Sequence, residues 1–375
     1  MMKQLIYLDY AATTPIDARV AAKMQLFLTA DHLFGNAASQ HGYGQVAHQA
    51  IETARAQVAE LIHADPREII WTSGATEANN LAIKGAARLY QCRGKHIVTV
   101  KTEHKSVLDV CQHLEKDGYE VTYLQPTATG RLDLAEFAAV LREDTILVSV
   151  MQVNNETGVI QDIAAIANIT AARGILLHVD AAQSAGKHPI DVRHIPIDLL
   201  SLSAHKVYGP KGIGALFLRR KPRVRVEPLL HGGGHEQGMR SGTLPTHQIV
   251  GMGEAFSLAQ VGLADEIVQI QALRQHFLAR VPMCQLNTDL ANSVPHILNV
   301  RFDGMLADAV LARLPVAAAT ASACQGKGTE GSYVLRAMGL NPEQVKSSVR
   351  FSFGRGCSLA DIELVTSAIV SLFSY

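Results

Sequence analysis

The stretch that decides the fold reads Leu-His-Val-Asp-Ala-Ala-Gln-Ser (177–184), Asp-Leu-Leu-Ser-Leu-Ser-Ala-His-Lys (198–206) and Val-Tyr-Gly-Pro-Lys-Gly-Ile-Gly (207–214). Two apolar runs around it, Ile175–Val179 and Leu199–Leu202, are short, continuous and bounded by turn residues, which is typical of buried strands. Each run ends in polar residues that an ordinary core strand would not carry. Because ligands bind at the carboxyl ends of strands in an open α/β sheet, we expect both ends to face one crevice.

The polar residues at these two strand ends suit one cofactor, pyridoxal phosphate (PLP). PLP needs a lysine for a Schiff base, an acid that keeps its ring nitrogen protonated, and donors for its phosphate. Lys206 and Asp180 would fill the first two roles. Gln183 would reach the ring hydroxyl, and Ser203 and His205 would hold the phosphate. Taken alone, Asp180 and Lys206 are more readily explained as an ion pair at a sheet edge, so the assignment depends on the rest of the chain.

Length and composition restrict the class of protein. With 375 residues, 48% hydrophobic and 18% charged, the chain can bury a large core in two domains, or in one large α/β domain with an appendage. A formal net charge of +0 gives no electrostatic reason for direct binding to nucleic acid or to an anionic membrane. No apolar run reaches the ~18 residues of a membrane helix. The apolar region near the start of the sequence is too short for a secretory signal. We therefore expect a cytoplasmic protein.

The order of predicted elements indicates an α/β fold. Strands and helices alternate from Ile69 to the strand beginning at Ile175, which predicts βαβ units and a mainly parallel sheet flanked by helices. The predicted elements are 69–72, 77–90, 96–100, 106–116, 120–124, 133–141, 146–151 and 162–173. Ahead of them, Thr14-Pro15 followed by Asp17 predicts a helix with Thr14 as its N-cap and Pro15 and Asp17 in its first turn.

A second, smaller α+β domain is predicted after a long helical segment that runs from Pro245 to about Ala279. We expect a large PLP-binding domain over residues 16–258, and a small domain made of residues 1–15 and 259–375. No Pro/Gly/Ser-rich linker separates the two, so they should pack tightly with the site between them.

Further strand ends carry polar loops. Ser73-Gly74-Ala75-Thr76 precedes a helix, and its N–H groups with the Thr76 hydroxyl would bind the PLP phosphate, although a simple capped turn explains the tetrapeptide equally well. His104 follows the strand 96–100, where it could lie over a cofactor ring and move protons. Asn154–Gly158 adds amide and carboxylate groups to the same rim. Four such ends together favour the PLP assignment of Lys206 over an ion pair.

The remaining chemistry-bearing motifs lie in the second half. His231–Glu236 has no third ligand at a suitable spacing, so we expect no metal site. The five cysteines form no Cys-x-x-Cys pair, which excludes a zinc ribbon or a disulfide framework. Cys324 begins a loop with three glycines between Gly326 and Gly331, which predicts a mobile, exposed thiol that acts as nucleophile or carrier. Arg350 would take a substrate carboxylate with its planar fork, although a surface ion pair is the alternative.

In this order, the motifs resemble those of the NifS-like cysteine desulfurases, of the type that serves iron–sulfur cluster assembly. These belong to the class V aminotransferase family of fold-type-I PLP enzymes. The motifs that carry the resemblance are Tyr7–Pro15, Ser73–Glu77, Lys101–His104, Asn154–Glu156, His178–Gln183, Ser203–Gly212, His231–Glu236, Met239–Thr243, Ser322–Cys324, Ser332–Arg336 and Arg350–Arg355. They span nearly the whole chain.

The resemblance implies a role for each matching residue. Lys206, His104 and Cys324 would be catalytic, with His104 stacked on the cofactor ring and Cys324 accepting sulfur. Asn155 and Arg350 would bind the substrate carboxylate. The implied cofactor-binding set is Lys206, Asp180 at the ring nitrogen, Gln183 at the ring oxygen, Ala75, Thr76, Asn155, Ser203, His205 and Thr243, the last from the partner subunit of a homodimer. No resident metal is implied, although Cys324 would transiently ligate a nascent iron–sulfur cluster.

The implied reaction is the PLP-dependent removal of sulfur from L-cysteine, which leaves L-alanine and a persulfide on Cys324. The sulfur would pass to acceptor proteins, either a cluster scaffold or tRNA-thiolation factors. The residues after Cys324 differ from the Ser/Ala-rich run of the family, and Tyr375 falls short of the extension that contacts a scaffold. The acceptor therefore stays open, and a desulfurase dedicated to DNA sulfur modification is an alternative.

Two other classes of protein can be distinguished from a cysteine desulfurase by simple observations. A selenocysteine lyase shares most of the motifs, and comparing turnover of cysteine and selenocysteine distinguishes it. A nucleotide-binding or metal-dependent α/β protein would need a P-loop, a Gly-x-Gly-x-x-Gly turn or a ligand cluster, and the sequence contains none of these. A yellow purified protein would indicate bound PLP, whereas a protein of this second class would be colourless and would take up no PLP.

Overall fold

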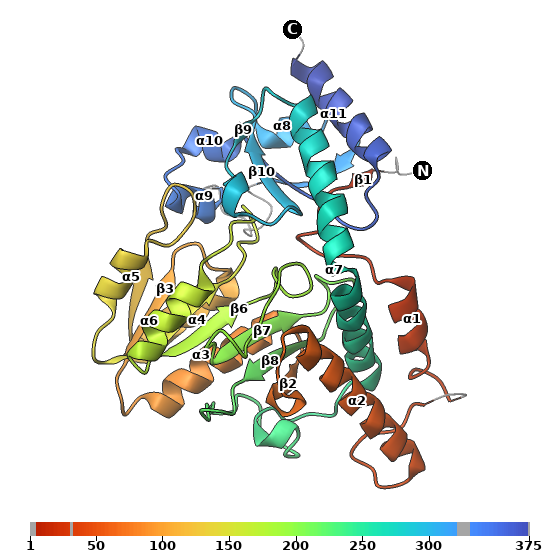
Figure 1. Cartoon of the computed structure of the whole chain (residues 1–375), viewed down its shortest axis with the longest axis vertical. Helices are drawn as coiled ribbons and strands as arrows, with labels where there is room; N and C mark the ends of the chain where they lie inside the picture. Colours follow the sequence, from red (N-terminus) through yellow and green to blue (C-terminus); the bar gives the residue numbers. More distant parts are fainter. Residues whose placement is uncertain (1–4, 31–32, 321–330, 374–375) are drawn as a thin grey trace.

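A mixed, mainly parallel sheet forms the centre of the larger part of the molecule (Figure 1). The computed structural model describes residues 5–30, 33–320 and 331–373. Within these ranges the sheet has seven strands in the order β2-β8-β7-β6-β5-β3-β4. Their bounds are β2 Ile69–Thr72, β3 His96–Val100, β4 Glu120–Leu124, β5 Thr145–Met151, β6 Leu176–Asp180, β7 Leu199–Ser203 and β8 Gly214–Leu218.

The expected fold class is confirmed, and one strand of this large sheet was not predicted from the sequence. From β7 through β6, β5 and β3 to β4, every neighbouring pair is parallel. The unpredicted strand β8 runs antiparallel to both β7 and β2. Its residues Ala215–Leu218 are as buried and apolar as those of the parallel strands, but they directly follow the glycine-rich turn that ends the sequence motif.

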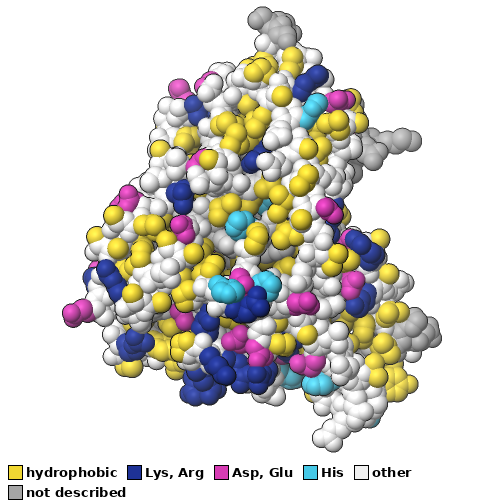
Figure 2. All heavy atoms as spheres, viewed as in Figure 1, with side chains coloured by type: hydrophobic (Ala, Val, Ile, Leu, Met, Phe, Trp, Pro, Cys, Tyr) yellow, Lys and Arg dark blue, Asp and Glu magenta, His cyan; other side chains and the backbone are white. Residues whose placement is uncertain are grey.

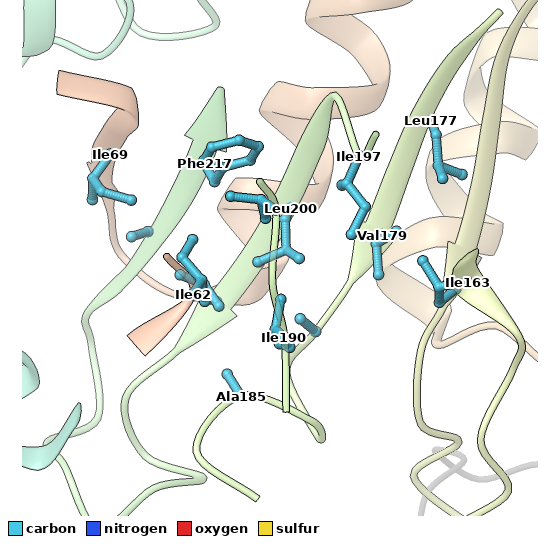
Figure 3. Close-up of a cluster of buried hydrophobic side chains, with 14 of the residues drawn as sticks. Ile62, Ile69, Ile163, Leu177, Val179, Ala185, Ile190, Ile197, Leu200 and Phe217 are labelled. Carbon is cyan, nitrogen blue, oxygen red and sulfur yellow. The ribbon is translucent and has the colours of Figure 1, made fainter. Parts of the chain in front are cut away.

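Helices cover both faces of this sheet, which is why its strands are apolar on both sides. One face packs on α3 (Ala75–Tyr90) and α4 (Lys105–Lys116) through a core that includes Ile70, Ile97 and Leu199. The other face packs on a second set of helices through residues of alternate register, such as Leu177, Val179 and Leu200 (Figure 3). That set is α2 Gly42–Leu61, α5 Leu134–Val140, α6 Ile163–Ala172 and α7 Thr246–Arg280.

The C-terminal part has its own sheet and its own core. In the described ranges this sheet has the strand order β12-β13-β10-β9, with all pairs antiparallel. Its core contains Phe277, Phe351 and Phe353. The remaining elements of this part are β1 Ile6–Tyr7, β9 Gln285–Leu286, η3 Leu290–Asn292, β10 Ile297–Arg301, α8 Ala307–Leu311, β11 Val316–Ala317, β12 Ala319–Thr320, α9 Tyr333–Ala337, α10 Pro342–Lys346, β13 Ser348–Ser352 and α11 Leu359–Phe373.

Helix α7 belongs to both cores. Met252 and Phe256 in its first half lie in the sheet core, and its second half places Leu273 and Phe277 in the C-terminal core. At 1.5 Å per residue, its 35 residues span about 50 Å. Figure 1 shows it running along one side of the molecule past both sheets. The predicted long helix after Pro245 is therefore confirmed.

The predicted start of the first helix was wrong. Helix α1 spans Ala18–Gln25, and its N-cap is Asp17, whose carboxylate accepts a hydrogen bond from the backbone N–H of Arg19. Thr14 caps nothing, because its hydroxyl donates to the His205 carbonyl oxygen at 3.0 Å. A local cap pattern cannot reveal that a hydroxyl is used in a distant contact.

Charged side chains of both signs lie on the face of the molecule drawn in Figure 2. Figure 2 shows positive and negative side chains interspersed on one face, with a denser group of Lys and Arg along its lower edge. None of the helices in the described ranges combines the length and the apolar character that crossing a bilayer requires.

A buried ion pair joins α2 to the glycine-rich segment that follows His231. Glu236 begins the 3-10 turn η2 (Glu236–Gly238) and accepts two hydrogen bonds from the Arg55 guanidinium, at 2.7 and 2.9 Å. It also accepts one from the backbone N–H of Trp71 on β2, at 2.8 Å. Glu236 thus has a structural role, and among the described residues no three His, Cys, Asp or Glu side chains are grouped as metal ligands.

Removing Glu236 should destabilise the protein strongly. Its side chain is 2% exposed, so Glu236→Ala leaves the Arg55 charge buried without its main partner. We expect the free energy of unfolding to fall by about 3–5 kcal/mol, measured by urea denaturation at fixed protein concentration. The control is Glu52→Ala, which removes the other carboxylate partner of Arg55, a side chain that is 41% exposed. That loss should stay below about 1 kcal/mol, and equal losses for the two variants would contradict the argument.

A polar row crosses the centre of the sheet two residues before the end of β6. The His178 ring contacts the Ser149 hydroxyl on β5 at 2.8 Å and the Ser201 hydroxyl on β7 at 2.9 Å. Burial lowers the pKa of His178 to about 4, only partly opposed by Asp180. The ring is therefore neutral at neutral pH, and its two contacts fix the middle of β6.

Acid should destabilise the fold through His178. The unfolded chain binds a proton here near pH 6.5 and the folded chain near pH 4, so stability is lost as the pH falls between these values. The expected loss from this group is about 3 kcal/mol over that interval. Unfolding free energies of wild type and His178→Gln, measured from pH 7 to pH 4, should converge by that amount. Parallel pH curves for the two proteins would show that His178 is not the group responsible.

Candidate active site

A cavity of about 560 Å³ lies at the carboxyl ends of the parallel strands. Its walls come from the ends of β6 and β7, the start of α3, the β3–α4 loop, the N-terminal segment and β13. The predicted site residues that line it are Ala75, Thr76, His104, Asn155, Asp180, Gln183, Ser203, His205, Lys206 and Arg350. The expectation that these separate strand ends face one crevice is confirmed by this geometry.

Lys206 follows β7 and points its amine at the N-terminal segment. Its Nζ donates to the carbonyl oxygens of Ala11 and Ala12, at 2.6 and 2.7 Å. The turn that carries it is held by Thr14, whose backbone N–H and hydroxyl donate to the His205 carbonyl oxygen and whose hydroxyl accepts from the Tyr208 N–H. These bonds keep the lysine at the wall of the cavity.

Asp180 ends β6 and is 4% exposed. One carboxylate oxygen accepts a hydrogen bond from Asn79 Nδ2 at 2.8 Å, and the other accepts from the Ala182 N–H at 2.9 Å. Both oxygens are therefore fixed in direction. A carboxylate held in this way at the cavity wall can form an ion pair with a protonated ring nitrogen.

His104 is the N-cap of α4, and its ring stays open to the cavity. Its Nδ1 accepts the Ser106 backbone N–H at 3.1 Å and contacts the Ser106 hydroxyl at 2.8 Å. The protein around the ring removes water, and this desolvation lowers the pKa of His104; the Asp180 charge opposes the effect and Lys206 adds to it. The ring is therefore neutral at neutral pH and able to accept a proton.

One end of the cavity is suited to a phosphate. Helix α3 begins at Ala75, and its N-cap, Gly74, has no side chain to bond the first N–H groups of the helix. The Thr76 hydroxyl, Ser203 and His205 line the same cavity. Burial, with the Lys206, Lys211 and Lys187 charges, lowers the pKa of His205 to about 4, so it is neutral at neutral pH. N–H groups and hydroxyls at a helix N-terminus are the donors that phosphate groups bind.

Arg350 extends from β13 across to the loop after β5. Its guanidinium donates to the Asn155 carbonyl oxygen and to the Asp9 carboxylate, both at 2.7 Å. Arg355, at the other end of the same motif, pairs with Glu266 at 2.6 Å and does not line the cavity. Arg350 does form an ion pair, with Asp9, but its side chain is buried and not at the surface. It also lies beside Asn155, the residue predicted to bind the substrate carboxylate with it.

Several buried polar atoms at this cavity have no hydrogen-bond partner among the described residues. They are Gln183 Oε1, Asn155 Oδ1 and Arg350 Nε. Buried polar groups are normally paired, so unpaired ones at one cavity indicate a polar ligand. With the amine of Lys206, the carboxylate of Asp180 and the phosphate-binding end, these residues fit PLP together with a substrate that carries a carboxylate.

Two predicted residues lie outside this set. Thr243 is exposed and does not line the cavity of its own chain. Cys324 lies outside the described residues. In contrast, Asn79 and Ser106 were not predicted although they contact Asp180 and His104. The available signal was an asparagine on the buried, otherwise apolar face of α3.

Comparison with known proteins agrees with this geometry. The family model described as "Aminotransferase class-V" matches residues 6–365. The chain is 56% identical over 367 residues to the cysteine desulfurase IscS of Escherichia coli O139:H28, covering 96% of this chain and 91% of that protein.

Solved structures are similar over nearly the whole chain. A NifS-like protein has a TM-score of 0.92 at 32% identity and covers 99% of both chains. A structure of SspA in complex with cysteine has a TM-score of 0.85 at 37% identity, with 93% of this chain and 99% of that chain covered. The chain is therefore a member of the class V aminotransferase family, whose cysteine desulfurases depend on pyridoxal phosphate.

Proposed function

We propose that this protein is a PLP-dependent cysteine desulfurase, which converts L-cysteine to L-alanine and carries the sulfur as a persulfide on Cys324. The observation that supports the proposal most directly is one cavity that gathers Lys206, Asp180, His104 and the uncapped start of α3. The 56% identity to an IscS desulfurase and the likeness to a structure containing cysteine favour this reaction.

The proposed roles follow from position. Asp180 would pair with the ring nitrogen, Gln183 with the ring oxygen, and Ala75, Thr76, Ser203 and His205 with the phosphate; Asn155 borders the ring and Thr243 comes from a partner subunit. When bound, PLP supplies an electron sink for charge that develops on the substrate Cα. Lys206 Nζ would take the proton from Cα, and His104 would move protons at the substrate.

Sulfur leaves the substrate through Cys324. Its thiolate attacks the substrate sulfur, the bond between Cβ and sulfur breaks, and the alanine is released once Cβ is protonated. The described chain resumes at residue 331, and its first residues are fixed at the cavity. The Ser332 hydroxyl, at the start of α9, donates to Glu156 Oε2 at 2.5 Å. Glu156 lines the cavity, so α9 begins at its rim.

A homodimer is part of the proposal. Large apolar side chains are exposed together on the connection between α1 and α2 and on the start of α2, including Leu28, Phe34 and Tyr43. Helices α1 and α2, which flank this connection, lie at the lower right of Figure 1. Exposed apolar groups of this kind mark protein interfaces, and a second copy of the chain is the partner that would bring Thr243 to the cavity of its neighbour.

The remaining proposals concern the setting of the reaction. We place the protein in the cytoplasm, with sulfur acceptors that are proteins of cluster assembly or tRNA thiolation. Co-purification of acceptors from another sulfur pathway would be the alternative outcome.

We also divide the chain into a PLP-binding domain of residues 16–258 and a small domain of residues 1–15 and 259–375. Separate cores around the main sheet and around Phe351 support that division.

Two variants separate the cofactor chemistry from sulfur transfer. Lys206→Ala should lose alanine formation altogether, because its amine is both the attachment point and the base. Cys324→Ser should still bind PLP and change its absorbance when cysteine is added, but it should form no persulfide. The measurements are alanine release, PLP absorbance and mass spectrometry of the protein. Normal alanine and free sulfide from Cys324→Ser would indicate a lyase without a sulfur-carrying thiol.

Arg350→Lys should weaken cysteine binding. The charge stays, but the planar fork that reaches Asn155 and Asp9 is lost. The expected cost is about 1.5–3 kcal/mol, so KM for cysteine should rise roughly 10- to 150-fold with a smaller change in kcat. Arg355→Lys is the matched control, because Arg355 lies in the same motif but off the cavity. If both variants saturate with cysteine like wild type, Arg350 does not hold the substrate.

A further inference from the structure

A continuous chain of hydrogen bonds connects Asp180 to His104 beneath the cavity. Asn79 Nδ2 donates to Asp180 Oδ2 at 2.8 Å and also to the Ser106 hydroxyl at 2.8 Å. The Ser106 hydroxyl lies 2.8 Å from His104 Nδ1. The four residues come from β6, α3 and α4, and Asn79 is fully buried at 0% exposure.

The chemistry of these groups fixes the direction of every bond. An ionised carboxylate only accepts, so the side of the Asn79 amide that faces Asp180 must be its NH₂ group. The second N–H of that group points at the Ser106 oxygen, which leaves the single hydroxyl proton of Ser106 for His104 Nδ1. The Ser106 backbone N–H donates to the same nitrogen at 3.1 Å. Nδ1 therefore receives two donors and carries no proton of its own.

From this network we propose that Asn79 is a positioning residue, which aims the Asp180 carboxylate and, through Ser106, holds neutral His104 in the tautomer that carries its proton on Nε2. The importance of the tautomer for catalysis rests on the proposed function. The two groups sit at the positions assigned to the ring nitrogen and to proton transfer, so one buried amide would set both.

Packing alone does not account for an asparagine at this position. Its Oδ1 is buried and has no partner among the described residues, which costs stability. Its neighbours on the buried face of α3, such as Ala78, Leu81 and Ala82, are apolar. An apolar side chain would suit that face and leave no unpaired oxygen. The amide is explained by the two acceptors that it joins.

The network also affects the charge state of His104. Protonating Nδ1 would require both Ser106 donors to turn away, so the network adds to the desolvation that lowers the pKa of His104. Asp180 and Asp109 act in the opposite direction and Lys206 in the same direction. Substituting Asn79 frees the Ser106 hydroxyl to reverse, so the pKa of His104 should rise, although the Ser106 N–H and the desolvation of the ring still act to lower it.

The direct test is nitrogen NMR of histidine rings in protein labelled with ¹⁵N-histidine. The signals of His104 are those that disappear in His104→Gln, and the protein is studied as purified and again after PLP is removed. Wild type should show the Nε2–H pattern for His104 at pH 7.5 in both. Asn79→Leu should show a mixture of tautomers and a raised pKa. Asn80→Leu is the control, since the side-chain amide of this neighbour on α3 donates to the Thr76 carbonyl oxygen, which lies outside the network.

Ser106→Ala keeps the test decisive if Asn79→Leu fails to fold. It removes the hydroxyl but leaves the bond between Asn79 and Asp180, so the pKa of His104 should rise. An Nδ1–H pattern in wild type, or a tautomer and pKa of His104 that neither variant alters, overturns the proposal.

Kinetics provide the second measurement. With cysteine as substrate, Asn79→Leu should lower kcat about tenfold or more and change KM less than about threefold, because no contact with the substrate is lost. Equal kcat values for Asn79→Leu and Asn80→Leu would count against a role in positioning. Wild type that releases no alanine from cysteine would refute the proposed function instead, while the NMR result would still decide the role of Asn79.

Discussion

The N-terminal segment from Leu8 to Thr14 is the constraint on which the site depends. Leu8 and Tyr10 are buried in the C-terminal core, and Asp9 pairs with Arg350. The next residues bond to the other side of the cavity: the carbonyl oxygen of Ala11 accepts from Gln183 and Lys206, and Thr14 holds the turn around His205. A short segment with a turn at residues 10–12 therefore sets the position of groups that belong to both cores.

The sequence predicted the parallel strands best because burial on both faces leaves continuous apolar runs. The strands at 69–72, 96–100 and 120–124 were predicted with their observed bounds. Strand β8 was missed because its glycine-rich approach resembled a loop. The cap at Thr14 was wrong because local rules assume that a hydroxyl before a helix serves that helix, whereas here it is used by His205.

The site was predictable where chemistry sits on side chains at strand ends, as for Asp180 and Lys206. Contributions made through the backbone left no such signal: the Ala11 and Ala12 carbonyl oxygens that receive the lysine amine are carried by residues with no functional group. Asn79 was missed for another reason, since it acts from within a helix and touches the cavity only through its neighbours. Supporting residues become visible only when three elements are brought together.

Helix α7 has a mechanical consequence for the molecule. Within the described helix, no residue between Ala259 and Ile270 is buried, so this stretch depends mainly on its own backbone hydrogen bonds and on the ion pair between Glu266 and Arg355. Both ends are anchored in different cores, which makes the helix a strut. A hinge between the cores would have to bend or break this strut, at the cost of several backbone hydrogen bonds at once. The two cores are therefore coupled through α7, so we expect the loss of one core to expose part of the helix on which the other is built and to destabilise it.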